Sequence, residues 1–439
     1  MNVLVFNASP KGRNSITVQT ARYLAAVFAD DTFDFVEIAT SWNAAEQRLA
    51  EIREKLARAD AVVFAYPIYS FFAPSQLIEA LSTMKAAQLP FAGKAFTQIT
   101  SSMKVLDPLA HEWLAKNARD LGLRVIPGVS ASQYDLPTEK GRAEACAFWR
   151  YFRAAASGAL DAPTPVRDGD RFDTVILTDL TPDDGALAAL IGRFRTVYPY
   201  RTRVCNVRDL GLRGGCLGCM RCMPEGHCVY TDGFEARYRE GHASVDATVM
   251  AFSVVHHGLG PELKRFFDRT YFSGHRPPAK RSSVAYLVNG DLADEPQLRQ
   301  LLNGYTQFRH TRDCGIVTAA DGEPGLRALA ARLQYSMEND FLLPRNFYGE
   351  ACMTMFRDIV TELRGVMRAD YRYFRDHGLL DFAQDRADRI RMSMQAGMLL
   401  SSPELERDLG MTFLEAMVKD HQTTVEQARQ GGNDSRSRC

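Results

Sequence analysis

The sequence predicts an α/β protein with two tandem, doubly wound parallel sheets and a C-terminal helical extension. Three observations support this: short apolar runs alternate with amphipathic helical stretches, the alternation restarts after a polar linker, and the strand-like runs stop at about Phe341. Strands that alternate with helices are typical of a parallel sheet covered on both faces.

The first series occupies the predicted domain 1–165. Strands are expected at 3–6, 35–38, 61–65, 95–100 and 124–129, and helices at 16–28, 44–57, 75–84, 108–122 and 138–159. The linker at 162–172 is rich in proline, glycine and charge, and the pattern restarts at 174–180. The second predicted domain, 166–335, continues with strands at 283–290 and 314–319 and helices at 297–307 and 324–337.

The two series read as a duplication. Val3 overlays Val175 and Asp60 overlays Asp246, and the extra residues of the second series fall where it holds a cysteine cluster. The remaining segment, 336–439, is predicted to be helical, packing on the sheet domains or forming a lid or substrate wall, with a disordered end at 431–439.

Composition excludes several functions. Lys plus Arg and Asp plus Glu both number 53, so nothing in the charge balance favours nucleic acid or an anionic membrane. No apolar stretch approaches the roughly 18 residues of a spanning helix, and the N-terminal residues lack the pattern of a secretory signal. A cytoplasmic location is therefore expected.

A polar loop joins the first expected strand to the first helix. Ser9, Lys11, Arg13, Asn14 and Ser15 supply hydroxyl, amide and cationic groups at a helix start, which suits a phosphate. The alternative is an ordinary strand-to-helix turn capped by Ser9 or Asn14.

Two further loops follow strands of the same half. Pro67, Ile68, Tyr69, Ser70 and Phe71 follow the third strand, and they supply flat apolar surface where open α/β sheets bind ligands. The fourth strand leads into a run that would add polar contacts, Thr100, Ser101 and Ser102.

With these loops the sequence resembles the flavodoxin-like NAD(P)H-dependent FMN reductases. The resemblance rests on Ser9-Pro10-Lys11 with Asn14-Ser15, on Pro67-Ile68-Tyr69 and on Thr100-Ser101-Ser102. It implies that FMN binds with its phosphate at the first loop and its ring at the second, and that NAD(P)H binds transiently as co-substrate. The sequence departs from the family pattern at Arg13 and at Ser70-Phe71.

The second half has lost these features. The counterparts of Lys11 and Gly12 are Asp183 and Asp184, whose carboxylates would repel a phosphate. The counterpart of Ser70-Phe71 is His256-His257. One FMN per chain, in the first half, is therefore predicted.

Four cysteines lie close together in the second half. Their spacing resembles that of the iron-sulfur flavoproteins of the same family and implies a [4Fe-4S] cluster held by Cys216, Cys219, Cys222 and Cys228. Zinc and unliganded thiols remain alternatives.

The resulting hypothesis is an NAD(P)H oxidoreductase that passes electrons from FMN to the cluster, to a small organic acceptor or to a redox protein. The duplicated halves would imitate the family homodimer within one chain, and a homodimer of whole chains remains open. No catalytic residue is assigned; the candidates are Tyr69, His256 and His257. The competing functions are a cluster-free quinone, azo or nitro reductase and a noncatalytic electron carrier or redox sensor.

Overall fold

The computed structural model describes residues 1–41, 43–241, 244–273, 275–278, 282–400 and 403–431. The chain divides into two compact units, Met1–Ala156 with Phe382–Cys439, and Ser157–Asp381. Each unit is described by itself. The end predicted to be disordered falls, from residue 432 on, outside the described residues.

The first unit is built on a parallel sheet. Its strands are β1 (Asn2–Asn7), β2 (Thr32–Glu37), β3 (Ala61–Pro67), β4 (Ala95–Ser102), β5 (Arg124–Val125) and β6 (Val129–Ser132). The order is β2-β1-β3-β4-β5, with β6 also paired to β4, and every pair is parallel. This is the flavodoxin-like order, in which the two strands beside the switch point are β1 and β3.

The fifth predicted strand, 124–129, is interrupted. Pro127 and Gly128 separate β5 from β6, and a Cβ at Gly128 would lie 2.4 Å from the backbone oxygen of Gln98. The chain therefore passes too close to β4 at this point to carry a side chain, and proline removes a ladder donor.

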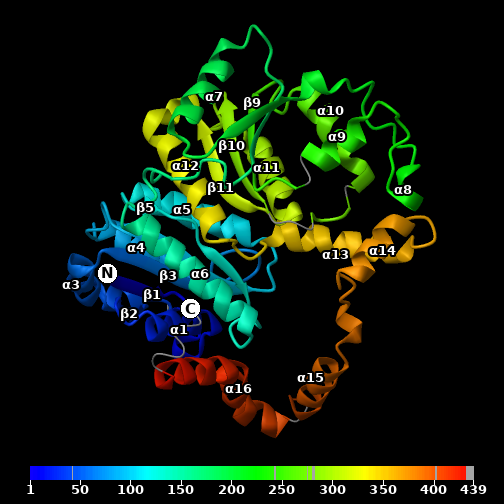
Figure 1. Ribbon diagram of the computed structural model, residues 1–439. Helices are drawn as coiled ribbons and strands as arrows, with labels where there is room; N and C mark the ends of the chain where they lie inside the picture. Colours follow the sequence, from blue (N-terminus) through cyan, green and yellow to red (C-terminus); the bar gives the residue numbers. More distant parts are fainter. Residues whose placement is uncertain (42, 242–243, 274, 279–281, 401–402, 432–439) are drawn as a thin grey trace. The chain divides into compact units, whose positions relative to one another are not determined.

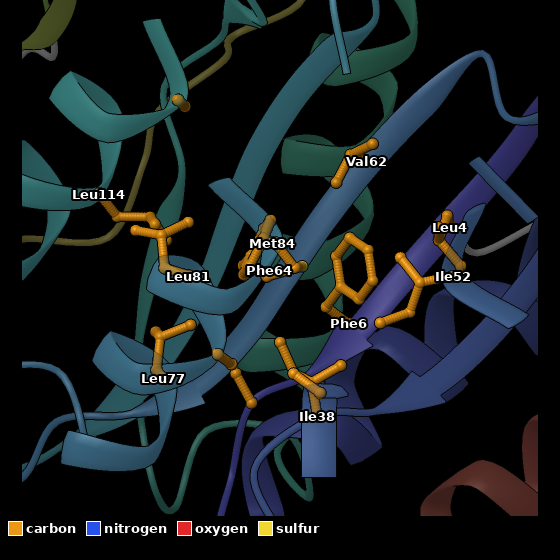
Figure 2. Packing of buried hydrophobic residues seen from close by; sticks show 14 of the residues in the cluster. Leu4, Phe6, Ile38, Ile52, Val62, Phe64, Leu77, Leu81, Met84 and Leu114 are labelled. Carbon is orange, nitrogen blue, oxygen red and sulfur yellow. The ribbon is translucent and has the colours of Figure 1, made fainter. Parts of the chain in front are cut away.

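Helices cover both faces of this sheet (Figure 1). They are α1 (Ile16–Val27), α2 (Ala44–Gln47), α3 (Leu49–Arg58), α4 (Ser75–Ala86), α5 (Asp107–Asp120) and α6 (Glu139–Ala156). On one face Leu4, Phe6 and Phe64 pack against Ile52 of α3 and Leu77 of α4 (Figure 2). The predicted single helix at 44–57 is broken at Arg48, which lies between α2 and α3.

The second unit repeats the sheet. Its strands are β7 (Thr174–Thr178), β8 (Thr202–Asn206), β9 (Ala247–Ser253), β10 (Ser283–Asn289) and β11 (Arg312–Thr318), in the order β11-β10-β9-β7-β8. Read from the other edge, this is the order of the first sheet, as the duplication predicts.

The helices of the second unit also form two layers. They are α7 (Gly185–Val197), α8 (Cys222–Glu225), α9 (Phe234–Gly241), α10 (Pro261–Arg269), α11 (Pro296–Arg309) and α12 (Gly322–Glu338). Side chains of α7 and α12 form one buried cluster with the sheet, and those of α9, α10 and α11 form another on the opposite face.

The helices beyond residue 336 are shared between the units. Helices α13 (Phe347–Glu362) and α14 (Arg368–Asp376) belong to the second unit, whereas α15 (Ala387–Leu400) and α16 (Pro403–Gln430) belong to the first. Helix α16 packs on α1, and Val418, His421 and Val425 are buried at helical spacing on its inner face. None of the described helices combines the length and apolarity that a bilayer crossing requires.

Candidate functional site

The carboxyl ends of β1, β3 and β4 bring the three predicted loops to one edge of the first sheet. The amide of Ile68 donates to the carbonyl of Ser101 at 3.3 Å, which joins the second loop to the third. The hydroxyls of Thr17 and Ser101 are hydrogen-bonded and join α1 to the third loop. Adjacent parallel strands thus assemble the loops into one site.

Hydrogen bonds of the buried Asn7 side chain hold the first loop in place. Asn7 Nδ2 donates to the carbonyl of Gly12 at 2.9 Å, and the Ser9 amide donates to Asn7 Oδ1 at 3.3 Å. Gly12 has φ +52°, which a residue with a Cβ adopts only with strain, and Ser9 is 1% exposed. The loop is therefore held in one conformation by buried polar contacts.

This loop leaves the start of α1 without a side-chain cap. Ser15 stands at the N-cap position, is buried and makes no capping hydrogen bond. The first amides of a helix need an acceptor and favour an anion. Lys11 is half-buried and Arg13 is exposed beside them, so the donors present fit the phosphate of FMN in number and in charge.

The second loop is a tight two-residue turn. Tyr69 and Phe72 exchange both backbone hydrogen bonds, at 2.9 and 3.0 Å, and Ser70 and Phe71 between them have φ +48° and +70°. Both central residues therefore lie in the left-handed region, where glycine or asparagine is usual. Tyr69 is 39% and Phe71 57% exposed, so the turn presents two rings to solvent, and partial burial raises the pKa of Tyr69.

The third loop differs from its prediction in detail. Thr100 is fully buried, and its hydroxyl pairs with Nε2 of His111 at 2.8 Å, so its side chain points into the protein. Ser101 bonds to Thr17, and Ser102 Oγ accepts the amide of Lys104 at 2.7 Å. The polar side chains of this run therefore shape the loop.

The sequence analysis missed the next four residues. Met103 is 68% exposed, whereas Lys104 is only 9% exposed and, like Leu106, has a positive φ. A buried lysine directly after a sheet edge is a candidate contact for an anionic or carbonyl group. The sequence feature that could have identified Lys104 is its place directly after the long apolar run of the fourth strand.

In the second unit, the carboxylate of Asp184 lies at the start of α7, the helix equivalent to α1. Asp184 caps α7 by accepting the amide of Leu187 at 3.0 Å, and its other oxygen bonds to the hydroxyl of Ser253. Asn289 donates to Ser253 Oγ at 2.9 Å and completes the network. The second unit thus places a carboxylate of its own at this helix start, where it accepts the amide of Leu187.

The turn of the second loop is also duplicated. Val255 and Gly258 exchange backbone hydrogen bonds, and His256 and His257 have φ +47° and +63°. The His257 Nδ1 lies 2.8 Å from Glu295 Oε1, and its side chain is 80% exposed. The two histidines therefore occupy the positions of Ser70 and Phe71, in the unit whose helix start is capped by Asp184.

Of the four predicted cysteines, Cys216 and Cys219 precede α8, Cys222 is its first residue and Cys228 follows it, and all are free thiols. Burial raises the pKa of the Cys222 thiol, and the other three lie close enough for their charges to raise it further. The Gly218 amide donates to Cys216 Sγ at 3.5 Å. Among the described residues, no three His, Cys, Asp or Glu side chains converge into a group that could hold a metal ion.

The strand order of the first sheet is flavodoxin-like. Residues 1–133 match the model of the family described as NADPH-dependent FMN reductase. The matched residues comprise the first sheet and the three loops at its carboxyl edge, so the similarity to this family is confined to the first unit.

The chain is also similar to individual proteins. The iron-sulfur flavoprotein of Archaeoglobus fulgidus is 21% identical over 175 residues, which cover 38% of this chain and 79% of the relative. Two similar solved structures are the flavoenzyme NAD(P)H:(acceptor) oxidoreductase FerB from Paracoccus denitrificans (19% identity, 28% of this chain and 74% of that chain, TM-score 0.25) and an FMN-dependent NADH-azoreductase from Bacillus anthracis in complex with FMN (15% identity, 36% and 98%, TM-score 0.26).

Proposed function

We propose that this chain is an NAD(P)H oxidoreductase with one FMN per chain, bound at the loops after β1, β3 and β4, that reduces a small organic acceptor. The observation that carries the proposal is the contrast between two helix starts: α1 has no side-chain cap, whereas Asp184 caps α7. FMN, when bound, accepts a hydride from NAD(P)H and releases the electrons singly or as a pair.

Residues of the three loops would each contribute to binding the phosphate or the ring of FMN. The amides at the start of α1, with Lys11 and Arg13, would bind the phosphate. The hydrogen bond from Asn7 to Gly12 would keep the loop in the conformation that presents these donors. Tyr69 and Phe71 would orient a flat ring against the sheet edge and exclude water from it. Lys104 would stand beside the ring as a fixed positive charge.

The phosphate assignment is tested by comparing FMN with riboflavin, which lacks the phosphate. We expect Lys11→Ala/Arg13→Ala to weaken FMN binding at least tenfold and to leave riboflavin binding unchanged, because the variant removes charge only at the phosphate. The matched control is Lys116→Ala/Lys140→Ala, on exposed helix surface of the same unit. Equal affinity of the unmodified protein for FMN and riboflavin would refute the assignment.

The stoichiometry is a separate test. Flavin released by denaturation should amount to one per chain. A ratio near two would show that the Asp184 network does not prevent binding in the second unit.

The cysteine loop supports a second centre. We propose that Cys216, Cys219, Cys222 and Cys228 hold a [4Fe-4S] cluster, which supplies one-electron chemistry when bound. The support is the close spacing of these four cysteines in the sequence and that all four are free thiols. Iron, sulfide and the visible spectrum after anaerobic reconstitution test this proposal; zinc in place of iron, or full reductase activity without metal, would contradict it.

A further inference from the structure

The second unit contains a cavity where the first unit has a closely packed core. The cavity measures about 70 Å³ and is lined by residues of the sheet and of helices α9, α10 and α11. On the equivalent face of the first sheet, the ring centres of Phe6 and Phe64 lie 4.8 Å apart (Figure 2), and those of Phe64 and Phe96 lie 5.9 Å apart. The duplication therefore shows which replacements accompany the cavity.

Strand pairing fixes which residues of the two sheets correspond. The pairs β1–β3 and β7–β9 have the same register when Val3 is matched to Thr174, one residue earlier than in the sequence overlay. The pairs β3–β4 and β9–β10 match when Ala95 is placed on Ser283. Four buried apolar residues of the first sheet then have smaller or more polar counterparts: Leu177 stands in place of Phe6, Thr248 of Val62, Met250 of Phe64 and Val284 of Phe96.

Helix α11 has also become more polar than its counterpart α5. Pro108 of α5 corresponds to Pro296 of α11, and each helix is followed by a residue of positive φ, Gly122 or His310. In this alignment polar residues replace apolar ones towards the end of the helix: Thr306 stands in place of Ala118, Arg309 of Leu121 and Thr311 of Leu123. The second unit thus has both a gap in its core and polar groups in the lining of that gap.

Aromatic rings form the wall of the cavity on the side of α10. Phe266 and Phe267 line it, at the positions where α4 has Ala80 and Leu81. The ring of Phe267 stacks on that of Tyr305, with 5.0 Å between centres and 19° between planes. These rings regain part of the volume lost from the sheet, and they offer a flat apolar surface to the hydrocarbon part of a ligand.

Arg309 is the charged residue of the lining, and it has donors available to a ligand. Its Nη2 donates to the hydroxyl of Tyr238 at 3.1 Å, and it forms no ion pair with a carboxylate of the described residues. The hydroxyls of Thr306 and Thr311, in contrast, donate to main-chain carbonyls of α11, at 2.9 and 3.2 Å. A guanidinium in an otherwise uncharged lining favours a carboxylate, which it can bind through two parallel hydrogen bonds.

The volume limits the size of the ligand. A molecule of liquid water takes about 30 Å³, so the cavity corresponds to about two water molecules, whereas benzene has been found in a cavity of about 150 Å³. The space therefore suits an aliphatic tail of about two or three carbons, and an aromatic ring exceeds it.

We propose that this cavity binds a short-chain monocarboxylate of the size of propionate or butyrate, with the carboxylate on Arg309 and the tail against the rings of Phe266 and Phe267. Thr248 and Val284 are the second residues of β9 and β10, so the site lies towards the amino ends of these strands. It uses neither the flavin loops of the first unit nor the cysteines. The proposal can therefore fail while the function proposed above holds.

Isothermal titration calorimetry of the full chain tests the ligand class with acetate, propionate, butyrate, hexanoate, benzoate and butyramide. Butyrate should bind about tenfold more tightly than acetate, because its two additional methylene groups fill apolar space. Hexanoate and benzoate should bind about tenfold more weakly than butyrate, because they exceed the volume. Butyramide, which keeps the shape but lacks the charge, should also bind about tenfold more weakly.

Two variants restore the residue of the first unit: Val284→Phe fills the space, and Arg309→Leu removes the charge. Each should weaken butyrate binding about tenfold. The matched controls are Leu301→Phe, at an exposed position of α11, and Arg327→Leu, at an exposed position of α12, and both should bind butyrate as the unmodified protein does. Far-ultraviolet dichroism and FMN per chain verify folding, and Arg309→Leu, at a half-buried position, tests the site even where Val284→Phe does not fold.

Hydrogen exchange measured by mass spectrometry locates the ligand, and butyrate should slow exchange in α11. Absence of both heat and exchange protection with every carboxylate at about 10 mM would overturn the proposal. Butyrate binding that survives Arg309→Leu unchanged would overturn the site, and hexanoate or benzoate binding as tightly as butyrate would overturn the ligand class. All of these outcomes leave the FMN assignment intact.

Discussion

Asp184 distinguishes the second unit from the first at the start of the helix that follows the first strand. The carboxylate caps α7 and is hydrogen-bonded to Ser253, at the position where the first unit leaves the start of α1 open. An N-cap of this kind stabilises a helix by about 1 kcal/mol. The same carboxylate that would repel a phosphate thus also contributes to the stability of the helix.

Asp184→Ala should therefore destabilise the second unit by about 1 kcal/mol, because the amide of Leu187 loses its acceptor. The effect should appear as faster hydrogen exchange in α7, measured by mass spectrometry. Asp183→Ala, at the exposed neighbouring position, is the control. The idea fails if α7 exchanges at the same rate in both variants.

His111 is expected to make the stability of the first unit depend on pH. Burial lowers the pKa of this imidazole to about 4, against a partly compensating charge on Asp107. The folded protein therefore holds the ring neutral where the unfolded chain, with a pKa of about 6.5, protonates it. The resulting stability is fully present above about pH 6.5 and is lost as the pH falls towards 4.

We expect the free energy of unfolding of the first unit to fall by roughly 2 kcal/mol between pH 6.5 and 4 on this account. All three tryptophans, Trp42, Trp113 and Trp149, lie in that unit's sequence, so urea titrations followed by tryptophan fluorescence report on it. His111→Asn should flatten the pH profile, whereas His256→Asn in the second unit should not. An identical profile in His111→Asn would assign the dependence to other groups.

Among the elements, the two-residue turns after β3 and β9 are strained in the same way. Each has two residues other than glycine in the left-handed region, at a cost of about 1–2 kcal/mol per residue. Strain kept in both copies indicates that the position of the turn matters more than its stability.

Replacing Ser70 and Phe71 by Asn and Gly should therefore stabilise the first unit by about 1–2 kcal/mol, raising the urea midpoint measured by tryptophan fluorescence. The same variant should raise the KM of a quinone acceptor, because it removes the exposed ring of Phe71. The matched replacement of His256 and His257 should leave both quantities unchanged. A KM that stays constant in the first variant would remove Phe71 from the acceptor site.

The elements also show what sequence patterns can and cannot predict. Long apolar runs such as β3 and β10 were predicted nearly to their ends, because every side chain in them is buried or nearly so. The edge strand β8 was missed, since Arg203 and Val204 are both exposed and the run has no apolar pattern. The cap formed by Asp184 was predicted only as repulsion, because its partners Ser253 and Asn289 are distant in sequence.

At the scale of the whole molecule, the first unit is discontinuous. Its first segment ends at Ala156, but α16, which packs on α1, comes from residues 403–430. Helix α1 is buried on all sides, with Thr17, Val18, Gln19, Thr20 and Ala21 buried in succession. The sheet domain therefore depends on a helix that the sequence places in a different segment.

A protein in which a long Gly/Ser linker replaces residues 157–381 should fold and bind FMN, whereas residues 1–165 alone should be less stable by several kcal/mol, because the outer face of α1 is uncovered. Urea midpoints and FMN affinity of the two proteins measure the difference. Equal stability would mean that α16 contributes nothing to the flavin domain. Val418→Asp, on the inner face of α16, should reproduce the loss within the full-length chain.

The discontinuity also has a consequence during synthesis. After residue 156 has left the ribosome, about 260 further residues must be translated before Val418 emerges, which takes on the order of 10–50 s at roughly 5–20 residues per second. Throughout that interval the nascent first unit leaves uncovered the face of α1 that α16 buries in the complete chain. The order of the chain thus makes this interval the time at which the protein most needs a chaperone, or early FMN, to avoid aggregation.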